Sequence, residues 1–270
     1  MERWQNKAAV VTGASSGIGA ALCVDLVKAG MVVAALARRE DRLVSLRDSL
    51  PENLRSRLHP IRCDVTLEAD VIRAFRWVEE HLGGVYVLIN NAGVVKEGNL
   101  IDQNNTDLIR AAVDTNVMGV VYATREAFHS MKEKDVAGHI ININSIVGHY
   151  VPPIPGFPMS IYPATKHAIT AMTETYRQEF SNLNTNIKVT SISPGAVETE
   201  IFRDEMKAKI PTIKAADVSS AILYCIQLHQ MYKFMNSRSA RSTKSGRKVI
   251  CYHYNYQIQC FFYIIWICLF

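Results

Sequence analysis

The stretch "VVTGASSGIGAAL", residues 10–22, decides the fold of this chain. A β-branched run leads through Gly13, Gly17 and Gly19 into an apolar, helix-like stretch. Glycines let backbone N–H groups approach a diphosphate, which also meets the positive end of the helix dipole. The spacing G-x-x-x-G-x-G is not the commoner G-x-G-x-x-G, and glycines also form tight turns. The strand–loop–helix context nevertheless favours dinucleotide binding.

The rest of the chain repeats this alternation of strand and helix. Apolar runs of strand length lie at 8–13, 32–37, 58–65, 85–93, 139–145 and 187–193, and helical stretches at 17–30, 67–83, 104–133 and 162–182. Strands that are apolar nearly throughout, separated by helix-length spacers, indicate a parallel sheet covered on both faces. With right-handed crossovers this predicts a single α/β domain, a doubly wound, Rossmann-type parallel sheet.

Composition narrows the class of protein. Hydrophobic residues make up 49% and charged residues 20% of the 270 positions, which is a globular balance. Much of the net charge of +5 comes from residues 236–248, which we interpret as a solvated segment and not as a nucleic-acid site. The six cysteines show no CxxC pairing and the histidines no HExxH spacing. We therefore expect a cytoplasmic protein with no metal, no secretory signal and no nucleic-acid partner.

The end of the second predicted strand, "ALARRE" at 35–40, bears on the choice of cofactor. An NAD enzyme normally has Asp or Glu here to accept hydrogen bonds from the ribose hydroxyls, which Ala37 cannot do. Arg38 and Arg39 offer guanidinium groups suited to a 2′-phosphate. Alternatively they are surface arginines beside a helix start. We favour NADP over NAD.

A set of motifs in fixed order points to a family. "TGASSGIG" (12–19), "NNAG" (90–93), "NINSIVG" (142–148), Tyr162 with Lys166, and "SPGAVET" (193–199) together resemble a short-chain dehydrogenase/reductase. The resemblance covers residues 5 to about 228. The sequences "GHYVPPIP" and "YPATKHAITAMTE" are similar to those of one branch of the family, which holds insect farnesol dehydrogenases and vertebrate reductases of steroids and other carbonyl compounds.

The resemblance implies four catalytic residues. Tyr162 is expected to exchange a proton with the substrate oxygen, which requires its pKa to fall from its ordinary value of about 10. Lys166 and the positive nicotinamide would supply the charge that favours phenolate, and Lys166 would also hold the nicotinamide ribose. Ser145 would hold the substrate oxygen. Asn116 matches the asparagine that bends the long helix and anchors a water in the proton relay.

The resemblance also implies the cofactor contacts. They are Gly13, Ser15, Ser16, Gly17, Ile18, Gly19, Arg38, Arg39, Asp64, Val65, Asn90, Asn91, Ala92, Gly93, Tyr162, Lys166, Pro194, Gly195, Val197 and Thr199. Two features depart from the family pattern. Ser145 and Tyr162 are seventeen residues apart, farther than in many relatives, and the extra residues lie in a proline-rich loop that should bound the substrate pocket. Pro163 directly follows the tyrosine, which is tolerated if a helix begins there.

The C-terminal residues break the pattern. Relatives close with a strand resembling "VQVHELTIRP", whereas this chain reads "LHQMYKFMNSRSAR" at 228–241. Because methionine has a single codon, the alternative reading frame can be checked from the protein sequence. Shifting the reading frame by two bases permits "NVQVHELTIRP". We therefore hypothesise that residues 229–270 are an out-of-frame ending, through splicing, a lesion or a gene-model error. We expect the domain to span 1–228, with its closing strand missing and an unpaired sheet edge.

These observations predict an NADP-dependent oxidoreductase that acts on a small lipophilic alcohol or carbonyl compound, such as a terpenoid, steroid or retinoid. The resemblance implies a homodimer or homotetramer. Two alternatives remain open at this point. One is an impaired variant that retains only cofactor binding. The other is a membrane-associated form held by the apolar residues 260–270, which are too few to span a bilayer as a helix.

Overall fold

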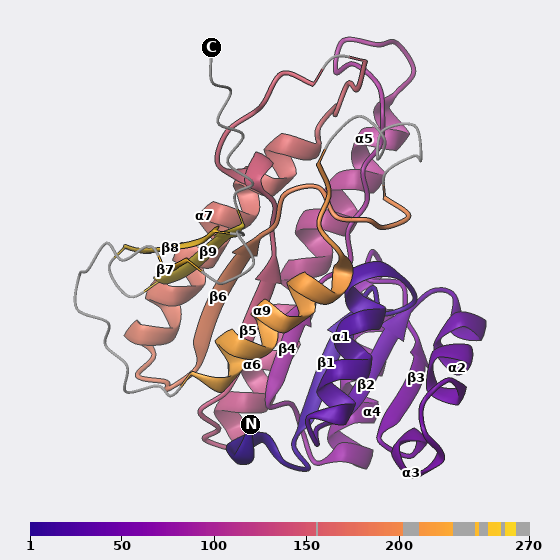
Figure 1. Cartoon of the computed structure of the whole chain (residues 1–270), viewed down its shortest axis with the longest axis vertical. Helices are drawn as coiled ribbons and strands as arrows, with labels where there is room; N and C mark the ends of the chain where they lie inside the picture. The colour runs from indigo at the N-terminus through magenta and orange to yellow at the C-terminus, as the bar shows by residue number, and fades with distance from the viewer. Residues whose placement is uncertain (155, 202–210, 229–240, 243–247, 255–256, 263–270) are drawn as a thin grey trace.

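The computed structural model describes residues 1–154, 156–201 and 211–228, together with the backbone of 241–242, 248–254 and 257–262. It confirms the doubly wound α/β fold (Figure 1). Six parallel strands lie in the order β3-β2-β1-β4-β5-β6. Their bounds are β1 (Ala8–Thr12), β2 (Val32–Ala37), β3 (Leu58–Arg62), β4 (Val87–Asn90), β5 (His139–Ile143) and β6 (Lys188–Ser193). The order reverses between β1 and β4, where such sheets open a ligand crevice at their carboxyl ends.

Helices cover both faces of the sheet. One face carries α1 (Gly17–Lys28), α2 (Glu40–Asp48) and α9 (Ala215–Gln227), and the other carries α4 (Glu68–Leu82), α6 (Gly119–Glu133) and α7 (Tyr162–Asn182) (Figure 1). The short elements are η1 (Glu2–Trp4), α3 (Glu52–Arg55) and η3 (Ile146–Gly148). Side chains of β1 alternate between the two cores, Ala9 and Val11 on the α1 side and Ala8 and Val10 on the α4 side. Both sets are buried, which explains why this strand is apolar throughout.

The long helix predicted at 104–133 has an interruption. It consists of α5 (Thr106–Val113), a π-helical turn η2 (Asp114–Met118) and α6. Asn116 lies within the π turn and is 1% exposed. Such turns insert an extra residue into a helix and occur frequently at functional sites.

The C-terminal end of α9 is held by the start of the chain. The Trp4 indole N–H donates to the carbonyl of Ile226 at 2.9 Å. Arg3 donates to the carbonyls of Ile226 and Leu228, both at 3.1 Å. These side chains satisfy carbonyl groups that the end of a helix leaves unpaired.

Beyond β6 the structure differs from the expectation that no strand closes the sheet. β9 (Gln257–Phe262) pairs with β6 in parallel, and β8 (Lys248–Tyr254) and β7 (Arg241–Ser242) follow in antiparallel pairs. An edge with unpaired N–H and C=O groups is a template for any available strand, which is the physical reason for this pairing. The domain boundary at residue 228 stays a prediction. None of the helices in the described ranges is long and apolar enough to cross a membrane.

Candidate functional site

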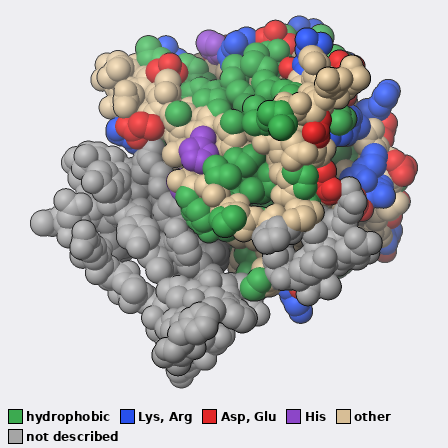
Figure 2. Space-filling view, turned by 90° about the horizontal axis from the view of Figure 1, so that it is seen from above, with side chains coloured by type: hydrophobic (Ala, Val, Ile, Leu, Met, Phe, Trp, Pro, Cys, Tyr) green, Lys and Arg blue, Asp and Glu red, His purple; other side chains and the backbone are tan. Residues whose placement is uncertain are grey.

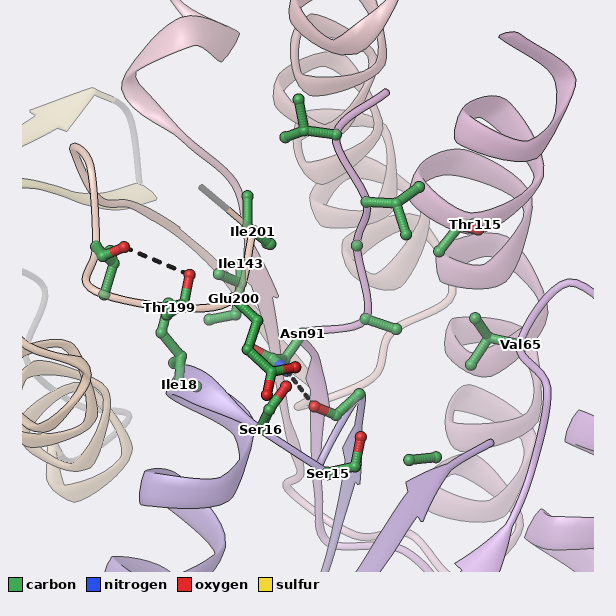
Figure 3. A pocket seen from close by; sticks show the side chains of 18 of the residues that line it. Ser15, Ser16, Ile18, Val65, Asn91, Thr115, Ile143, Thr199, Glu200 and Ile201 are labelled. Carbon is green, nitrogen blue, oxygen red and sulfur yellow. Dashed lines mark hydrogen bonds between the residues drawn. The ribbon is translucent and has the colours of Figure 1, made fainter. Parts of the chain in front are cut away.

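A cavity of about 440 Å³ opens at the carboxyl ends of the six parallel strands (Figure 3). This volume lies within the usual range for small-molecule sites. The predicted site residues that line it are Gly13, Ser15, Ser16, Gly17, Ile18, Arg38, Arg39, Asp64, Val65, Asn91, Ala92, Gly93, Ser145, Tyr162, Lys166, Pro194, Gly195, Val197 and Thr199. The structure thus brings together residues from segments that are distant in the sequence.

The glycine-rich turn leaves no room for side chains at its glycine positions. A Cβ atom added to Gly17 would lie 2.8 Å from Cγ2 of Thr199, on the segment that follows β6. One added to Gly19 would lie 2.5 Å from the carbonyl oxygen of Gly13. The turn therefore presents its backbone to the cavity at the start of α1, as a site for a diphosphate requires.

Three predicted residues lie outside the lining of the cavity. Gly19 packs beneath the turn. Asn90, at the end of β4, is buried in the sheet and donates to Oγ1 of Thr124 and Oδ1 of Asn142, both at 2.9 Å. Its side chain supports the site from within the core because it points to the α6 side of the sheet. Asn116 is also buried, behind the residues that line the cavity.

Asn116 joins the loop after β4 to the start of α7. Its Oδ1 accepts from the backbone N–H of Val94 at 2.8 Å, and its Nδ2 donates to the carbonyl of Val94 at 2.9 Å. Nδ2 also contacts Oγ1 of Thr165 at 3.1 Å, and that hydroxyl donates to the carbonyl of Tyr162 at 2.7 Å. The chain of bonds fixes the backbone of the turn that carries Tyr162.

Tyr162 is the first residue of α7, and Pro163 follows in the first helical turn. The proline therefore removes no helical hydrogen bond. Lys166, one turn later, donates from Nζ to the carbonyl of Ile143 at 2.8 Å. Its Nζ atom lies 5.7 Å from the centroid of the Tyr162 ring. The phenol and the ammonium group therefore share one wall of the cavity.

Burial dominates the electrostatics of this pair. It raises the pKa of Tyr162 to about 12, and a hydrogen bond with Ser145 acts in the opposite direction. Burial also lowers the pKa of Lys166 to about 8. The downward shift expected for the phenol is thus not produced by the protein groups alone.

We expect replacement of Lys166 by methionine to stabilise the fold at pH 7. Because its folded pKa of about 8 lies below the ordinary value near 10, the unfolded state binds its proton more readily. Wild-type stability should therefore rise with pH between about 8 and 10, and at pH 7 the buried charge costs up to about 3 kcal/mol. The variant loses the hydrogen bond to Ile143, which offsets about 1 kcal/mol.

Thermal unfolding between pH 6 and 10 measures this effect. The Lys166→Met variant should melt several degrees higher at pH 7, and the difference should shrink toward pH 10. A lower melting temperature for the variant at pH 7 would contradict the assignment of a strained, buried ammonium group.

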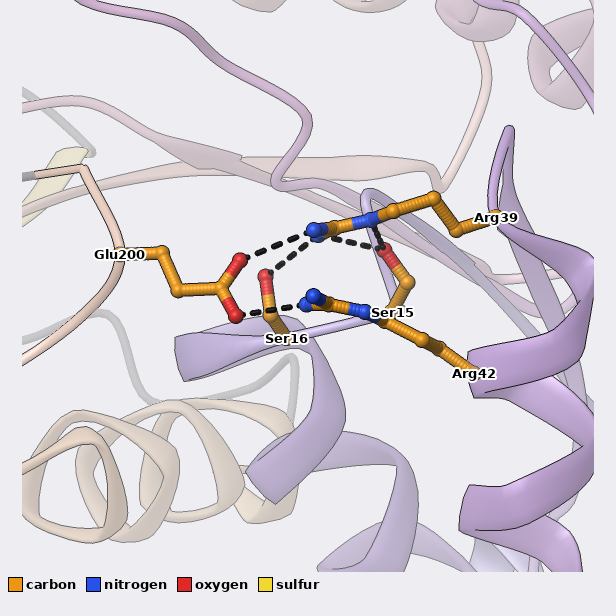
Figure 4. A network of polar contacts seen from close by, with 5 residues as sticks. All are labelled: Ser15, Ser16, Arg39, Arg42 and Glu200. Carbon is orange, nitrogen blue, oxygen red and sulfur yellow. Dashed lines mark hydrogen bonds and ion pairs between the residues drawn. The ribbon is translucent and has the colours of Figure 1, made fainter.

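The opposite end of the cavity carries a cluster of arginines. Arg39 donates to Oγ of Ser15 at 3.2 and 3.0 Å and to Oγ of Ser16 at 3.0 Å (Figure 4). Its Nη1 atom also pairs with Oε2 of Glu200 at 3.0 Å, and Arg42 pairs with Oε1 of Glu200 at 2.6 Å. Arg38 also lines the cavity. This end therefore offers guanidinium groups at the end of β2, as the sequence predicted.

Sequence reasoning missed Glu200. It follows Thr199 directly, yet it contacts Arg39 across 161 residues of chain. A single glutamate next to a recognised motif has no local pattern that indicates such a partner. Other unpredicted lining residues are Ala37, Cys63, Val94, Val95, Lys96, Thr115, Ile143, Asn144 and Ile201.

The proline-rich loop leads into Tyr162, but none of its described residues before Tyr162 lines the cavity, so its place at the substrate pocket stays a prediction. Its Pro158 carbonyl accepts from the backbone N–H of Gly98 at 3.2 Å, which ties it to the loop after β4. Large apolar side chains stay exposed around both loops and on the segment after β6, namely Leu100, Ile101, Tyr150, Val151 and Ile201. Seen from above the strand ends, hydrophobic side chains gather on this face (Figure 2). This face of the molecule therefore carries exposed apolar side chains, of which Ile201 lines the cavity.

Comparison with known proteins identifies the family. The family model described as "short chain dehydrogenase" matches residues 7–209. Farnesol dehydrogenase of Aedes aegypti is 49% identical over 239 residues, which cover 86% of this chain and 96% of that protein. Dehydrogenase/reductase SDR family member 11 of Gallus gallus is 40% identical over 238 residues, covering 84% and 92%. The resemblance inferred from the motifs is confirmed.

Solved structures agree on the fold but not on the nucleotide. A short chain dehydrogenase/reductase from Burkholderia phymatum in complex with NAD has a TM-score of 0.74 at 28% identity, covering 84% of this chain and 87% of that one. The closed form of serine dehydrogenase complexed with NADP+ has a TM-score of 0.73 at 29% identity, covering 83% and 90%. Both kinds of nicotinamide cofactor thus occur on this fold.

Proposed function

The chain belongs to the short-chain dehydrogenase family, and we propose that it moves a hydride between NADP and a lipophilic alcohol or the matching carbonyl compound. One observation carries the proposal. Ser145, Tyr162 and Lys166 line the same cavity that presents Arg38 and Arg39 at its far end. A phenol, a hydroxyl and an ammonium group suit proton exchange with a substrate oxygen, and guanidinium groups suit a phosphate.

The turn at Gly13–Gly19 fits a dinucleotide diphosphate, because a Cβ atom at any of its three glycines would collide with neighbouring protein atoms and displace the backbone that faces the cavity. Asp64 and Val65 would contact the adenine, and Asn91, Ala92 and Gly93 the ribose side. Lys166 would hold the nicotinamide ribose, and Pro194, Gly195, Val197 and Thr199 the nicotinamide. When bound, the nicotinamide accepts or supplies the hydride.

The proton is handled by groups of the protein. In alcohol oxidation, Tyr162 takes the hydroxyl proton as the carbinol hydrogen leaves with its electron pair. Ser145 holds the reacting oxygen through a hydrogen bond that strengthens as charge builds on it. Lys166, with a pKa of about 8, is largely protonated at pH 7 and, together with the positive charge of a bound nicotinamide, would favour the phenolate. Asn116 positions the turn and would anchor a water that passes the proton onward.

NADP is proposed over NAD on the chemistry of the adenosine end. Ala37 ends β2 where an acidic residue would be needed to bind the ribose hydroxyls. Arg39 lies against Ser15 and Ser16, so its guanidinium is held over the start of α1, where a 2′-phosphate would be neutralised.

The exposed apolar side chains on this face support a lipophilic substrate of the terpenoid, steroid or retinoid kind, in line with the similarity to a farnesol dehydrogenase. We also propose that the chain forms a homodimer or homotetramer in the cytoplasm. Neither of the two alternatives raised from the C-terminal residues is favoured, since every described residue that lines the cavity precedes residue 202.

Cofactor binding and turnover test this function. The full chain should change the fluorescence of NADPH on binding, and the Kd measured in this way should be lower for NADPH than for NADH. It should also reduce NADP+ at the nicotinamide absorbance band when given long-chain allylic alcohols, with short alcohols such as ethanol as the control. A preference for NADH, or turnover of ethanol equal to that of the long alcohols, would contradict the proposal.

A further inference from the structure

Glu200 pairs with Arg39, the same arginine that we assign to the 2′-phosphate of the cofactor. The segment 194–201 runs from the end of β6 over the glycine-rich turn and brings Thr199 against Gly17. Figure 3 shows Glu200 turned from this segment toward Ser15 and Ser16. The carboxylate thus lies at the end of the cavity that we assign to the adenosine phosphate.

Among the described residues, the polar contacts of the Glu200 carboxylate are all with arginines. Oε2 pairs with Arg39 and Oε1 with Arg42 (Figure 4). The two guanidinium groups, that of Arg39 first, hold the pKa of the Glu200 carboxyl below its usual range, so it is an anion at neutral pH. The Nε and Nη2 atoms of Arg39 donate hydrogen bonds to the hydroxyl groups of Ser15 and Ser16. The hydrogen-bonding capacity of Arg39 toward the cavity is therefore partly taken by Glu200.

The ion pair is weakly held. The side chains of Arg39 and Glu200 are 43% and 55% exposed, and such pairs contribute little to stability. Farther back, the segment is fixed by backbone bonds between Glu198 and Ile213 and between Ile213 and Ala196, each at 2.9 Å. Glu200 can therefore leave Arg39 without loss of the segment's anchor.

We propose that the Glu200 carboxylate competes with the cofactor 2′-phosphate for Arg39, so that Glu200 weakens NADP binding, speeds NADP release and limits the preference for NADP over NAD. A carboxylate and a phosphate dianion repel each other a few ångströms apart, so each weakens the binding of the other to Arg39. A cofactor with a free 2′-hydroxyl brings no such charge. This inference rests on the proposed use of NADP.

Glu200→Gln is the direct test, because it removes the charge and keeps the shape. The Kd for NADPH should fall about 5- to 20-fold and the NADPH dissociation rate should fall with it, while the Kd for NADH changes less than about twofold. Glu198→Gln is the matched control. It lies on the same segment, where its carboxylate accepts from Thr212 at 3.0 Å, and it should leave both values unchanged.

A double-mutant cycle identifies the shared arginine. In an Arg39→Ala background the gain from Glu200→Gln should shrink, because competition for Arg39 is lost and only the direct repulsion between the carboxylate and the phosphate remains. The inference is overturned if Glu200→Gln leaves NADPH binding unchanged, tightens both cofactors equally, or weakens NADH. The last result would mean that the carboxylate accepts a bond from the 2′-hydroxyl.

A small probe separates this inference from the proposed function. Adenosine 2′,5′-bisphosphate and adenosine 5′-monophosphate differ only in the 2′-phosphate, and calorimetry measures both. Tighter binding of the bisphosphate by the wild-type chain supports NADP use, and a further gain in Glu200→Gln supports competition. A 2′-phosphate preference without that gain overturns the competition alone. No preference in either chain overturns both proposals.

Discussion

Replacing Tyr162 by phenylalanine should lower kcat about 10²- to 10⁴-fold and leave the Kd for NADPH within about threefold of wild type. The magnitude is that of a positioned general acid/base. The ring stays in place at the start of α7, so the lining of the cavity is kept and only the proton-exchanging oxygen is lost. Single-turnover kinetics, with NADPH binding measured by fluorescence, gives both quantities.

Tyr176 provides the matched control on the same helix. Burial raises its pKa to about 12, as it does for Tyr162, and it is hydrogen-bonded to Thr124, away from the cavity. Tyr176→Phe should lose one hydrogen bond, about 1 kcal/mol of stability, and keep kcat within about threefold. Equal loss of kcat in the two variants, or a Tyr162→Phe protein that keeps a tenth of its activity, would contradict the assigned role.

The second large effect is expected at Gly13. Its φ of 65° is in the left-handed region, and a Cβ atom would lie 2.7 Å from the backbone Cα of Ala92 and 3.0 Å from its nitrogen. Because the obstacle is backbone after β4, a side chain here must displace a wall of the cavity. Gly13→Ala should lose about 3 kcal/mol or more of stability and bind NADPH at least tenfold more weakly.

Gly83 separates collision from conformation. It also has a left-handed φ, 74°, at the end of α4, but nothing lies within 4 Å of its added Cβ. Gly83→Ala should therefore cost only about 1–2 kcal/mol, with NADPH binding unchanged. Chemical denaturation and fluorescence titration of both variants compare the two. Equal losses would show that the contact with Ala92 is unimportant.

The parts of the site that could be predicted from sequence are those set by local chain geometry. Gly13, Gly17 and Gly19 lie between one strand and one helix, so their spacing alone places them in a turn. Tyr162 and Lys166 are one helical turn apart, so any helix beginning at Tyr162 puts them on one face. The alternation of apolar runs likewise determined the parallel sheet, because its strands are buried on both faces.

Other features depend on contacts between distant segments and left no local pattern. Glu200 meets Arg39 only because the segment after β6 crosses the turn after β1. Asn90 belongs to the motif "NNAG", but its side chain points into the core. The motif does not specify on which face of the sheet the last side chain of β4 lies. The open edge of β6 was expected from the sequence, but the pairing of β9 with it was not, because an open edge accepts any available strand and does not specify which one.

Isotope transfer tests the central claim most directly. The full chain is incubated with NADPH carrying deuterium at both C4 positions of the nicotinamide and with a long-chain allylic aldehyde, and the alcohol product is analysed by mass spectrometry. The account predicts one deuterium on the carbinol carbon for wild type, and no label there from D₂O with unlabelled NADPH. A product without cofactor-derived deuterium, or with label taken from solvent at that carbon, would contradict hydride transfer at this site.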